Sequence, residues 1–595
     1  MKKLFFYAAL FAAGFAVTSC SSDKEVVASD NGQVPNGESY ISLSLQLPTT
    51  SATTRANDTF DDGLAIEYKV KDATLVLFEG TAENTAVYSG NYDLNLSWAL
   101  SGTTTDQITT TAQIVQKVDN RTSSTNNFYA YVVLNKPALL ATILSSASKG
   151  TSTFNQMFGT TATLSTTNLT ETVDGTDHFI PMTNAPLAKY AGGSAAPTDG
   201  TYSILSKIDK DLIFATEIEA KNHAATSVYV ERMYSKVTVA NGSANKLQDA
   251  NGDDITNSSS TTINYTVSGW TLDNTNKSAY FQRQLDGTFP NYTWYNYYSN
   301  HASVTGANVY RFAGSNEVAS GKGYRIYWAL DPNYNSFTPG TFNAATVSNV
   351  SGSLSNPQYC YENTFNVANQ KEQSTTRALV KVVFNNGSDF YAINDDPKTF
   401  YDENGIKGKV IEFLMADPTI HAAATAAGIT TATVANSTID LDIITNPSEV
   451  TVNTTTLELS DGTNSLDCST YASIINAMFN HATNPTKRIR FYDDGLAYYP
   501  ILIKHFGDDQ CYWTSTEHLS QTSYADEGTA PVSRYLGRYG VLRNNWYHLN
   551  ITKISNLGLP NIPTLTDDDD DKVKSYISVQ INILSWAKRT QDVTL

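Results

Sequence analysis

The 595-residue chain has little positive charge and little charge of either sign. Lysine and arginine total 40 against 58 aspartates and glutamates, which gives a net charge of -18, and only 16% of residues are charged. Binding of DNA or RNA needs a basic surface, so this composition argues against a nucleic-acid-binding protein. The hydrophobic share of 41% and the aromatic share of 11% also exclude a disordered acidic chain.

Cysteines and long apolar runs are scarce as well. Besides Cys20, the cysteines are Cys360, Cys468 and Cys511, which lie far apart in the sequence. Their spacing fits neither a CxxC redox motif nor a zinc knuckle, and three thiols form at most one disulfide. We therefore expect buried, inert thiols. Beyond the N-terminal segment, no stretch reaches the roughly 20 apolar residues that a membrane-spanning helix needs.

Threonine, asparagine, serine and tyrosine take the place of the missing charges, with 35 tyrosines alone. Threonine and tyrosine favour strands, whereas asparagine, serine and glycine favour turns. This composition predicts an all-β protein with a few short helices. A helix is expected over residues 138–148, after Pro137. The main strands are expected over residues 40–47, 70–78, 128–134, 228–239, 263–270, 324–330, 378–384, 498–506, 546–554 and 576–583.

The first twenty residues have the pattern of a secretory signal. Two lysines precede an apolar run over residues 4–17, and small residues lead to Cys20. The end of this run, Val17-Thr18-Ser19-Cys20, resembles the lipobox of bacterial lipoproteins, in which the cysteine is lipidated and becomes the first residue. The alternative is an ordinary signal peptide with a chance cysteine. With a lipobox, residues 1–19 are removed and the lipid on Cys20 is the membrane attachment.

Motifs for catalysis and for cofactor binding are missing from the sequence. The eight histidines are scattered, and neither an HExxH motif, a P-loop nor a GxSxG elbow is present. We therefore expect no enzyme, no cofactor and no metal site, although a pair of distant carboxylates of the glycosidase type stays open. An aromatic cluster over residues 292–298 could stack sugars, but core or edge residues of a tyrosine-rich β-domain are favoured.

The first and last predicted strands have interchangeable patterns. Each alternates four aliphatic residues with serine, glutamine or asparagine, and each adjoins a polar segment. The aliphatic positions are Ile41, Leu43, Leu45 and Leu47 in the first strand and Ile577, Val579, Ile581 and Ile583 in the last. Two ordinary edge strands are one interpretation. The other is strand replacement: removal of the first strand leaves an apolar groove that the last strand of a neighbouring chain fills, head to tail.

Strand replacement requires a cleavage site after the first strand. Thr53-Thr54-Arg55-Ala56 places a lone arginine in a polar stretch, as a trypsin-like protease requires. The same tetrapeptide recurs at residues 375–378, directly before a predicted strand. Folding should hide this second copy, so cleavage is expected between Arg55 and Ala56.

Several stretches resemble the fimbrillins of type V pili, the lipoprotein-derived pilins of Gram-negative anaerobes, and among them the shaft subunits of the short (minor) fimbria. Besides the lipobox, the matching stretches are KDATLVLFEG from Lys71, VERMYSKV from Val230, VSGWTLDNTNKSAY from Val267, YRIYWALDPNY from Tyr324, YCYENTF from Tyr359, AYYPILIKHFG from Ala497 and GRYGVLRNNWYHLNITKISNLGLP from Gly537. Together they span nearly the whole chain.

The resemblance implies a fold and a set of roles. It implies two β-sandwich-like domains of transthyretin-like topology, lipidation at Cys20, cleavage after Arg55, and a C-terminal donor strand with Trp586 anchoring the tail. The family does not use a second TTRA sequence. The expected segments are 1–19 signal peptide, 20–55 lipidated propeptide with the first strand, 56–230 N-terminal β-domain, 231–565 C-terminal β-domain, and 566–595 acidic linker and donor strand.

The resemblance also implies partners and a location. The expected partners are identical or related pilin subunits, a trypsin-like maturation protease, the outer membrane through the lipid of the precursor, and host surface ligands. The location is a fimbria at the cell surface. A complete donor strand and no additional lectin-like domain favour a shaft subunit. The alternatives are a pilus tip adhesin and a monomeric glycan-binding surface lipoprotein.

Overall fold

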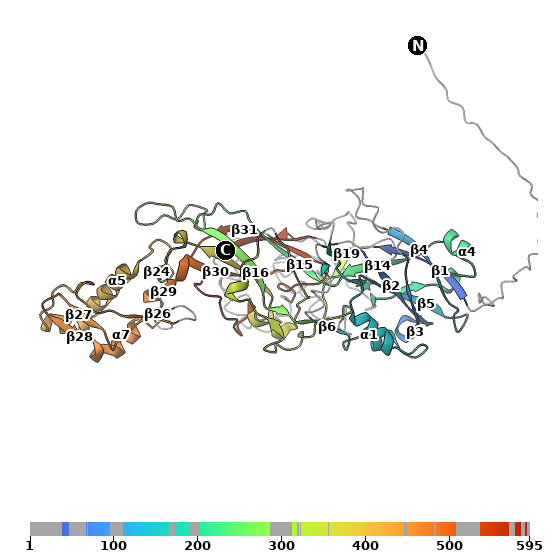
Figure 1. The fold of residues 1–595 in the computed structure, drawn as a ribbon, viewed down its shortest axis with the longest axis horizontal. Coiled ribbons are helices and arrows are strands. Elements are labelled where there is room, and N and C mark those ends of the chain that lie inside the picture. Colours follow the sequence, from blue (N-terminus) through green and yellow to red (C-terminus); the bar gives the residue numbers. More distant parts are fainter. Residues whose placement is uncertain are drawn as a thin grey trace, which may run out of the picture.

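The protein is elongated and built mainly of β-strands in several sheets, with few and mostly short helices, as a computed structural model shows (Figure 1). The all-β prediction is confirmed. The structure describes residues 38–46, 67, 70–95, 111–165, 173–174, 177–189, 202–285, 312–317, 321, 323–354, 356–444, 449–480, 484–506, 536–570, 577–584 and 590–591. Within these ranges, no helix is both long enough and apolar enough to cross a membrane.

The N-terminal half contains a nine-stranded sheet that curls around its own core. Its main path runs β13-β1-β14-β9-β5-β2-β3, with β4 on β1 and β12 on β5. Its strands are β1 (Glu38–Gln46), β2 (Ala73–Gly80), β3 (Val87–Asp93), β4 (Thr111–Asp119), β5 (Asn127–Leu134), β9 (Met182–Asn184), β12 (Ser206–Ile208), β13 (Ile213–Phe214) and β14 (Thr226–Arg232).

Strands β2 and β5 are buried on both faces, because both of their alternating side-chain sets meet apolar partners. One set, with Leu75 and Val132, joins the core under the curled sheet. The other, with Phe78 and Tyr131, packs against two short helices. The helices of this half are α1 (Leu139–Ser146), α2 (Phe154–Phe158) and α4 (Glu217–Asn222). The helix expected over residues 138–148 is confirmed as α1.

The C-terminal half is a sandwich of two sheets. A five-stranded sheet is ordered β22-β15-β31-β32-β33 and a three-stranded sheet β16-β23-β30. Alternate residues such as Leu549 and Val380 from the two sheets share one core. These strands are β15 (Ser235–Asn241), β16 (Thr266–Asp273), β22 (Gln358–Cys360), β23 (Arg377–Val383), β30 (Leu496–Leu502), β31 (Trp546–Ile554), β32 (Ile577–Leu584) and β33 (Thr590–Gln591).

Short strands connect the two halves. The chain changes from one sheet to the other between β14 and β15, so the single strand expected over residues 228–239 is two strands. The break falls at Met233 and Tyr234, both buried, and Met233 donates its backbone N–H to the carbonyl of Pro181. The break could not be predicted from the sequence, because none of the usual turn residues glycine, proline or asparagine stands between the two strands. The remaining short strands near the junction are β6 (Thr163–Ser165), β7 (Val173–Asp174), β8 (Asp177–His178), β10 (Leu187–Ala188), β11 (Tyr202–Ser203), β17 (Thr275–Asn276), β18 (Ser278–Tyr280), β19 (Ala313–Glu317), β20 (Tyr324–Ile326) and β21 (Phe342–Asn343).

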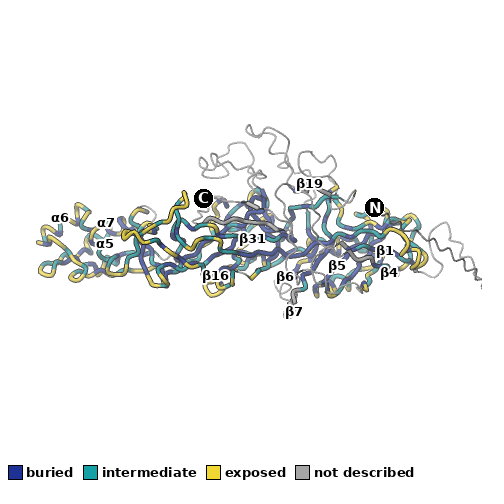
Figure 2. Tube along the Cα trace, turned by 90° about the horizontal axis from the view of Figure 1, so that it is seen from above, coloured by how far each residue is buried: buried dark blue, intermediate teal, exposed yellow. Residues whose placement is uncertain are grey.

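A separate module is inserted between β23 and β30 and forms one end of the molecule (Figure 1). It has its own apolar core, distinct from that of the sandwich, and Figure 2 shows buried positions inside this module as well. The stretch 231–565, expected as one β-domain, thus holds several separate cores. The elements of this distal module are β24 (Phe390–Ile393), α5 (Glu403–Ala416), α6 (Pro418–Ala426), β25 (Leu441–Ile444), β26 (Glu449–Val452), β27 (Glu458–Ser460), β28 (Ser465–Asp467), α7 (Ala472–Met478) and β29 (Ile489–Tyr492).

Local sequence signals explain the two consecutive helices of the distal module. Asp402 caps α5 by accepting a hydrogen bond from the backbone N–H of Gly405 at 2.7 Å. Asp417 caps α6, whose first residue is Pro418. Buried Ile406 and Val410 lie one helical turn apart on the inner face of α5. These caps could have revealed both helices from the sequence.

Candidate functional site

The candidate site consists of the two terminal strands and the strands that hold them. β1 pairs along its whole length with β4, antiparallel, from Glu38 opposite Asp119 to Gln46 opposite Thr111. On its other side, Leu43–Gln46 pair with β14 in parallel, and Tyr40 and Ile41 pair with β13. β1 is therefore an interior strand with neighbours on both edges, at the opposite end of the molecule from the distal module (Figure 1).

The aliphatic side of β1 is part of the N-terminal core. Ile41, Leu43 and Leu45 each have 0% exposure and pack among core residues of β2, β5 and β14. Leu47, the fourth predicted member, lies outside the described residues. The alternation predicted from the sequence is thus confirmed for three of the four positions.

The other side of β1 is partly covered, which the sequence did not predict. Ser42 is buried, Tyr40 and Ser44 are half-buried, and helix α4 contacts the strand. On the aliphatic side, the Ser39 hydroxyl donates a hydrogen bond of 2.6 Å to the amide oxygen of Asn120. The polar side is thus less exposed than the alternation alone suggests, because small serines lie beside the helix there. Removal of β1 would open a groove lined by apolar side chains and by unpaired backbone groups of β4 and β14.

The last strand has a different environment. β32 pairs antiparallel with β31 from Ile577 opposite Ile554 to Leu584 opposite Trp546, with one irregularity between Ile551 and Lys553. On its other side, within the described residues, it pairs with β33 at two positions. Within its own subunit, β32 is thus the last long strand of the C-terminal sheet, with the short β33 outside it.

Each of the four predicted donor residues of β32 lies opposite a residue of β31. Ile577, Val579, Ile581 and Ile583 are paired with Ile554, Ile551, Leu549 and Tyr547 of β31, in that order. These four β31 residues are fully buried in the sandwich core. Trp586, the predicted tail anchor, lies outside the described residues.

The acidic run before the last strand is only partly the solvated linker that the sequence suggested: Asp567 and Asp568 are exposed, but the run is held by distant side chains. Asp569 forms an ion pair of 2.6 Å with Lys371, and Gln373 donates a hydrogen bond to Asp567. Asp570 is only 2% exposed. The expectation failed in part because a basic and an amide side chain far away in the sequence lie beside the aspartates and offset their mutual repulsion.

Glu67 holds the chain between the expected cleavage site and β2 against the folded body. Glu67 is fully buried; its carboxylate pairs with Lys236 at 2.5 Å and accepts a hydrogen bond from the Tyr359 hydroxyl. Lys236 is on β15 and Tyr359 on β22, so the carboxylate ties this part of the chain to the C-terminal sheet. Burial, followed by the negative charge of Glu67, raises the pKa of Tyr359. Nothing in the sequence singled out these three residues.

Of the two TTRA copies, the structure describes the second, at residues 375–378. In the second copy, Thr375, Thr376 and Arg377 are buried, and Arg377 forms ion pairs of 2.8 Å with Asp273 and Glu372. The prediction that folding hides this copy is confirmed. Arg55 and Ala56 of the first copy lie outside the described residues, as does Cys20.

The two described thiols are buried and free, as expected. Burial raises the pKa of Cys360 to about 12 and that of Cys468 to about 11, so neither is a reactive thiolate at neutral pH. Cys511 and the aromatic cluster over residues 292–298 lie outside the described residues.

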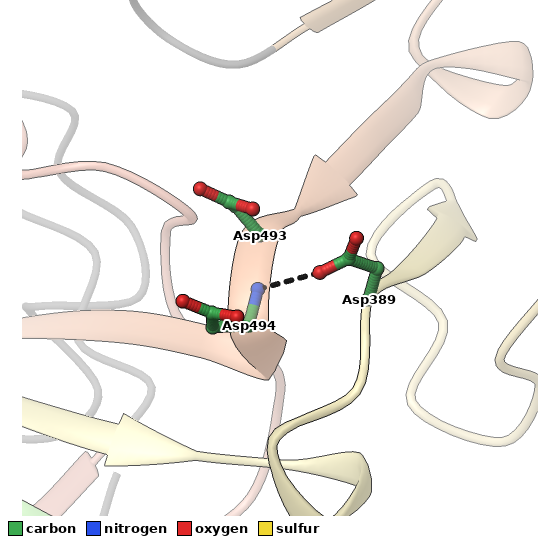
Figure 3. A group of neighbouring side chains, drawn as sticks. All are labelled: Asp389, Asp493 and Asp494. Carbon is green, nitrogen blue, oxygen red and sulfur yellow. Dashed lines mark hydrogen bonds between the residues drawn. The ribbon is translucent and has the colours of Figure 1, made fainter.

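Asp389, Asp493 and Asp494 bring three carboxylates together where the distal module joins the sandwich (Figure 3). All three side chains are exposed. Asp389 accepts a 2.7 Å hydrogen bond from the backbone N–H of Asp494, whose φ of 50° lies in the left-handed region. The cluster is therefore explained by the turn it stabilises, and we assign no cation to it.

Comparisons with known proteins concern first the C-terminal part of the chain. Residues 490–592, which include β31, β32 and β33, match the family model described as the C-terminal region of fimbrillin, major fimbrial subunit protein type IV. No curated protein matches the chain.

Solved structures show weak likenesses over long stretches. A candidate cell adhesion protein from Parabacteroides distasonis is 10% identical with a TM-score of 0.35, covering 92% of this chain and 97% of its own. The tip fimbrial protein Mfa3 from Porphyromonas gingivalis, with a C-terminal truncation, is 9% identical with a TM-score of 0.27, covering 92% and 99%. At such identities and TM-scores, these likenesses carry no argument about this chain.

Proposed function

We propose that the chain is a fimbrillin-type structural pilin that polymerises by strand exchange into adhesive surface fimbriae, and the fimbrillin match of its C-terminal region supports this. The observation that carries the proposal is β1, an interior strand that comes before the expected cleavage site. Its loss would leave a groove with the shape of one strand, between β4 and β14. The C-terminal strand of a neighbouring subunit, with the same alternation, is the proposed occupant.

The apolar groove is deep enough to hold such a strand tightly. Full burial of one aliphatic side chain is worth roughly 1.5–3 kcal/mol, so Ile41, Leu43 and Leu45 together represent about 5–9 kcal/mol. Main-chain pairing along both edges adds about 1 kcal/mol per hydrogen bond. A donor strand with four aliphatic residues recovers this energy, which makes release from the polymer slow.

The proposal includes a maturation path. Cys20 carries the lipid that holds the precursor in the outer membrane, and a trypsin-like protease cuts between Arg55 and Ala56. Concealment of Arg377 supports the choice of Arg55 between the two TTRA copies. The buried Glu67 lies eleven positions after Ala56, so the chain stays attached to the folded body close to the new N-terminus.

Limited trypsin treatment followed by negative-stain microscopy tests this function. Trimmed wild-type protein should begin at Ala56 and form fibres, whereas untreated protein should not. Arg55→Gln should block both steps. Arg55→Lys is the matched control, because trypsin also cuts after lysine, and it should still form fibres. A first fragment beginning at Ala378, or fibres from the Arg55→Gln protein, would contradict the proposal.

A subunit at the fimbrial tip is a second candidate. The distal module favours it, because a separate core at the end of the molecule could present a binding surface away from the polymer. Deletion of residues 575–595 distinguishes the two functions. A shaft subunit should lose elongation after cleavage while remaining a folded monomer, whereas a tip subunit forms no homopolymer before or after the deletion.

A further inference from the structure

The second TTRA sequence has a structural role that its likeness to the cleavage site does not reveal. Arg377 is 1% exposed, and its guanidinium has three partners. Nε donates to Asp273, Nη1 donates to Glu372, and Nη2 donates to the backbone carbonyl of Pro563. The side chain therefore connects the first residue of β23 to the chain that leads toward the last strand.

Glu372 continues the connection. One carboxylate oxygen pairs with Arg377, and the other accepts hydrogen bonds from the backbone N–H and the hydroxyl of Thr566, at 3.0 and 2.8 Å. Backbone bonds run alongside: the N–H of Glu372 donates to the carbonyl of Asp568, and the N–H of Gln373 donates to that of Thr566. Residues 566–568 are thus bound through both main chain and side chain.

Lys371 binds the last described part of the acidic run. Its ammonium group lies 2.6 Å from the carboxylate of Asp569, and this hydrogen bond raises the pKa of Lys371. The next residue, Asp570, is almost fully buried and donates its backbone N–H to the carbonyl of Gln370. The side-chain and main-chain contacts therefore extend as far as Asp570.

We propose that Lys371, Glu372 and Arg377 form an anchor that fixes the root of the C-terminal strand and so sets the reach of that strand toward a neighbouring subunit. This inference rests on the proposed strand exchange. From Asp570 to Ile577 the chain spans at most about 25 Å, at 3.3–3.6 Å per residue. Without the anchor, the nearest fixed point would be Ile562, which packs against Leu379 and Tyr498, and the possible span would be about twice as long.

A short tether has two effects on assembly. It holds the donor strand within a small volume beside the sandwich, which raises its effective concentration for a groove in that volume. It also leaves fewer conformations to be lost when the strand binds. The three anchor residues are positioning residues: they act on assembly by placing β32 and need not touch the neighbour.

Charge reversal at Lys371 tests the anchor. Lys371→Glu places two carboxylates together and should release the root, whereas the double variant Lys371→Glu with Asp569→Lys restores an ion pair. Lys398→Glu, at an exposed lysine of the distal module, is the matched control for net charge. Amide hydrogen exchange of the peptide covering residues 564–570 reports on the anchor in the uncleaved monomer. Ladder length on an unboiled gel after trypsin reports on assembly.

For Lys371→Glu we expect about tenfold faster amide exchange in this peptide and shorter ladders. The double variant should return both the exchange rate and the ladder length to wild-type values. Lys398→Glu should change neither. Unchanged exchange would overturn the anchor, and faster exchange with normal ladders would overturn its role in placing the strand. If cleaved wild-type protein forms no ladder, the proposed function fails. The amide exchange rates of uncleaved wild type and Lys371→Glu then still show whether the anchor exists.

Discussion

Strands β1 and β32 have the same residue pattern and nearly the same length, yet the molecule holds them differently. β1 has neighbours along both edges, its aliphatic face is fully buried, and its other face is partly covered. Among the described residues, β32 has a full partner in β31 and a two-residue contact to β33 on the other side. Loss of β1 therefore divides a sheet and its core, whereas loss of β32 exposes one sheet edge. This difference favours the N-terminal strand as the one that a donor strand would replace in the proposed exchange.

Removal of β1 is the strongest test of this comparison. Trypsin-cut protein that also lacks residues 575–595 should lose about 5–9 kcal/mol of stability in its N-terminal sheet, since three fully buried side chains are gone. The loss should appear as a separate low-temperature transition in calorimetry. A synthetic peptide of residues 575–595 should restore the original melting curve.

The matched control is the same peptide with Ile581→Asp, which forces a charge into the apolar groove and should not restore the curve. Equal rescue by both peptides would show that the groove does not select the aliphatic face. An unchanged melting curve after cleavage would show that β1 is dispensable.

A smaller effect is expected from one core residue of β1. Leu43→Ala should destabilise the uncleaved precursor by about 2–5 kcal/mol, because the site is fully buried and the cavity cannot collapse completely. Urea unfolding measures this loss. After cleavage at Arg55 and removal of the N-terminal fragment, variant and wild type should be identical, since residue 43 is no longer present. A difference that persists in the mature protein would place β1 outside the removed segment.

The smallest predicted effect concerns a group that touches neither terminal strand. Burial raises the pKa of Asp331 to about 7, against the opposing effect of backbone N–H groups of Thr364 and Asn333. A carboxyl with a raised pKa adds stability below its unfolded pKa of about 4, and this contribution is lost as pH rises to about 7.

Between pH 5 and pH 7.5, Asp331 should therefore lower the free energy of unfolding by about 2–3 kcal/mol. Asp331→Asn should remove this share of the pH dependence, equally in the precursor and in the assembled form. Urea unfolding at the two pH values checks the sign. A larger pH effect in one of the two forms would instead point to titrating groups near the exchanged strands.

Much of the fold could be predicted because its signals are local. The alternation of small polar and aliphatic residues predicted β1, and β31 has the predicted bounds Trp546–Ile554. Position directly before a strand predicted that Arg377 would be concealed. The caps Asp402 and Asp417 were equally local, and the two helices they begin could have been found in the same way.

The remaining features depended on residues that meet only in the folded protein. The acidic run becomes an anchored segment through Lys371 and Glu372, almost 200 positions earlier in the sequence. Glu67 finds its partners on β15 and β22. No spacing rule connects such residues, because long-range ion pairs carry no periodic pattern.

The sequence by itself determined which residues form strands and which side of each strand is apolar, since side-chain alternation follows from backbone geometry. It thereby determined that the two ends of the chain are interchangeable in pattern. Only the tertiary structure decided that β1 is interior and that β32 lies near a sheet edge, next to the short β33. Neighbours on both sides depend on how distant strands assemble, and that assembly maximises burial over the whole molecule rather than over one segment.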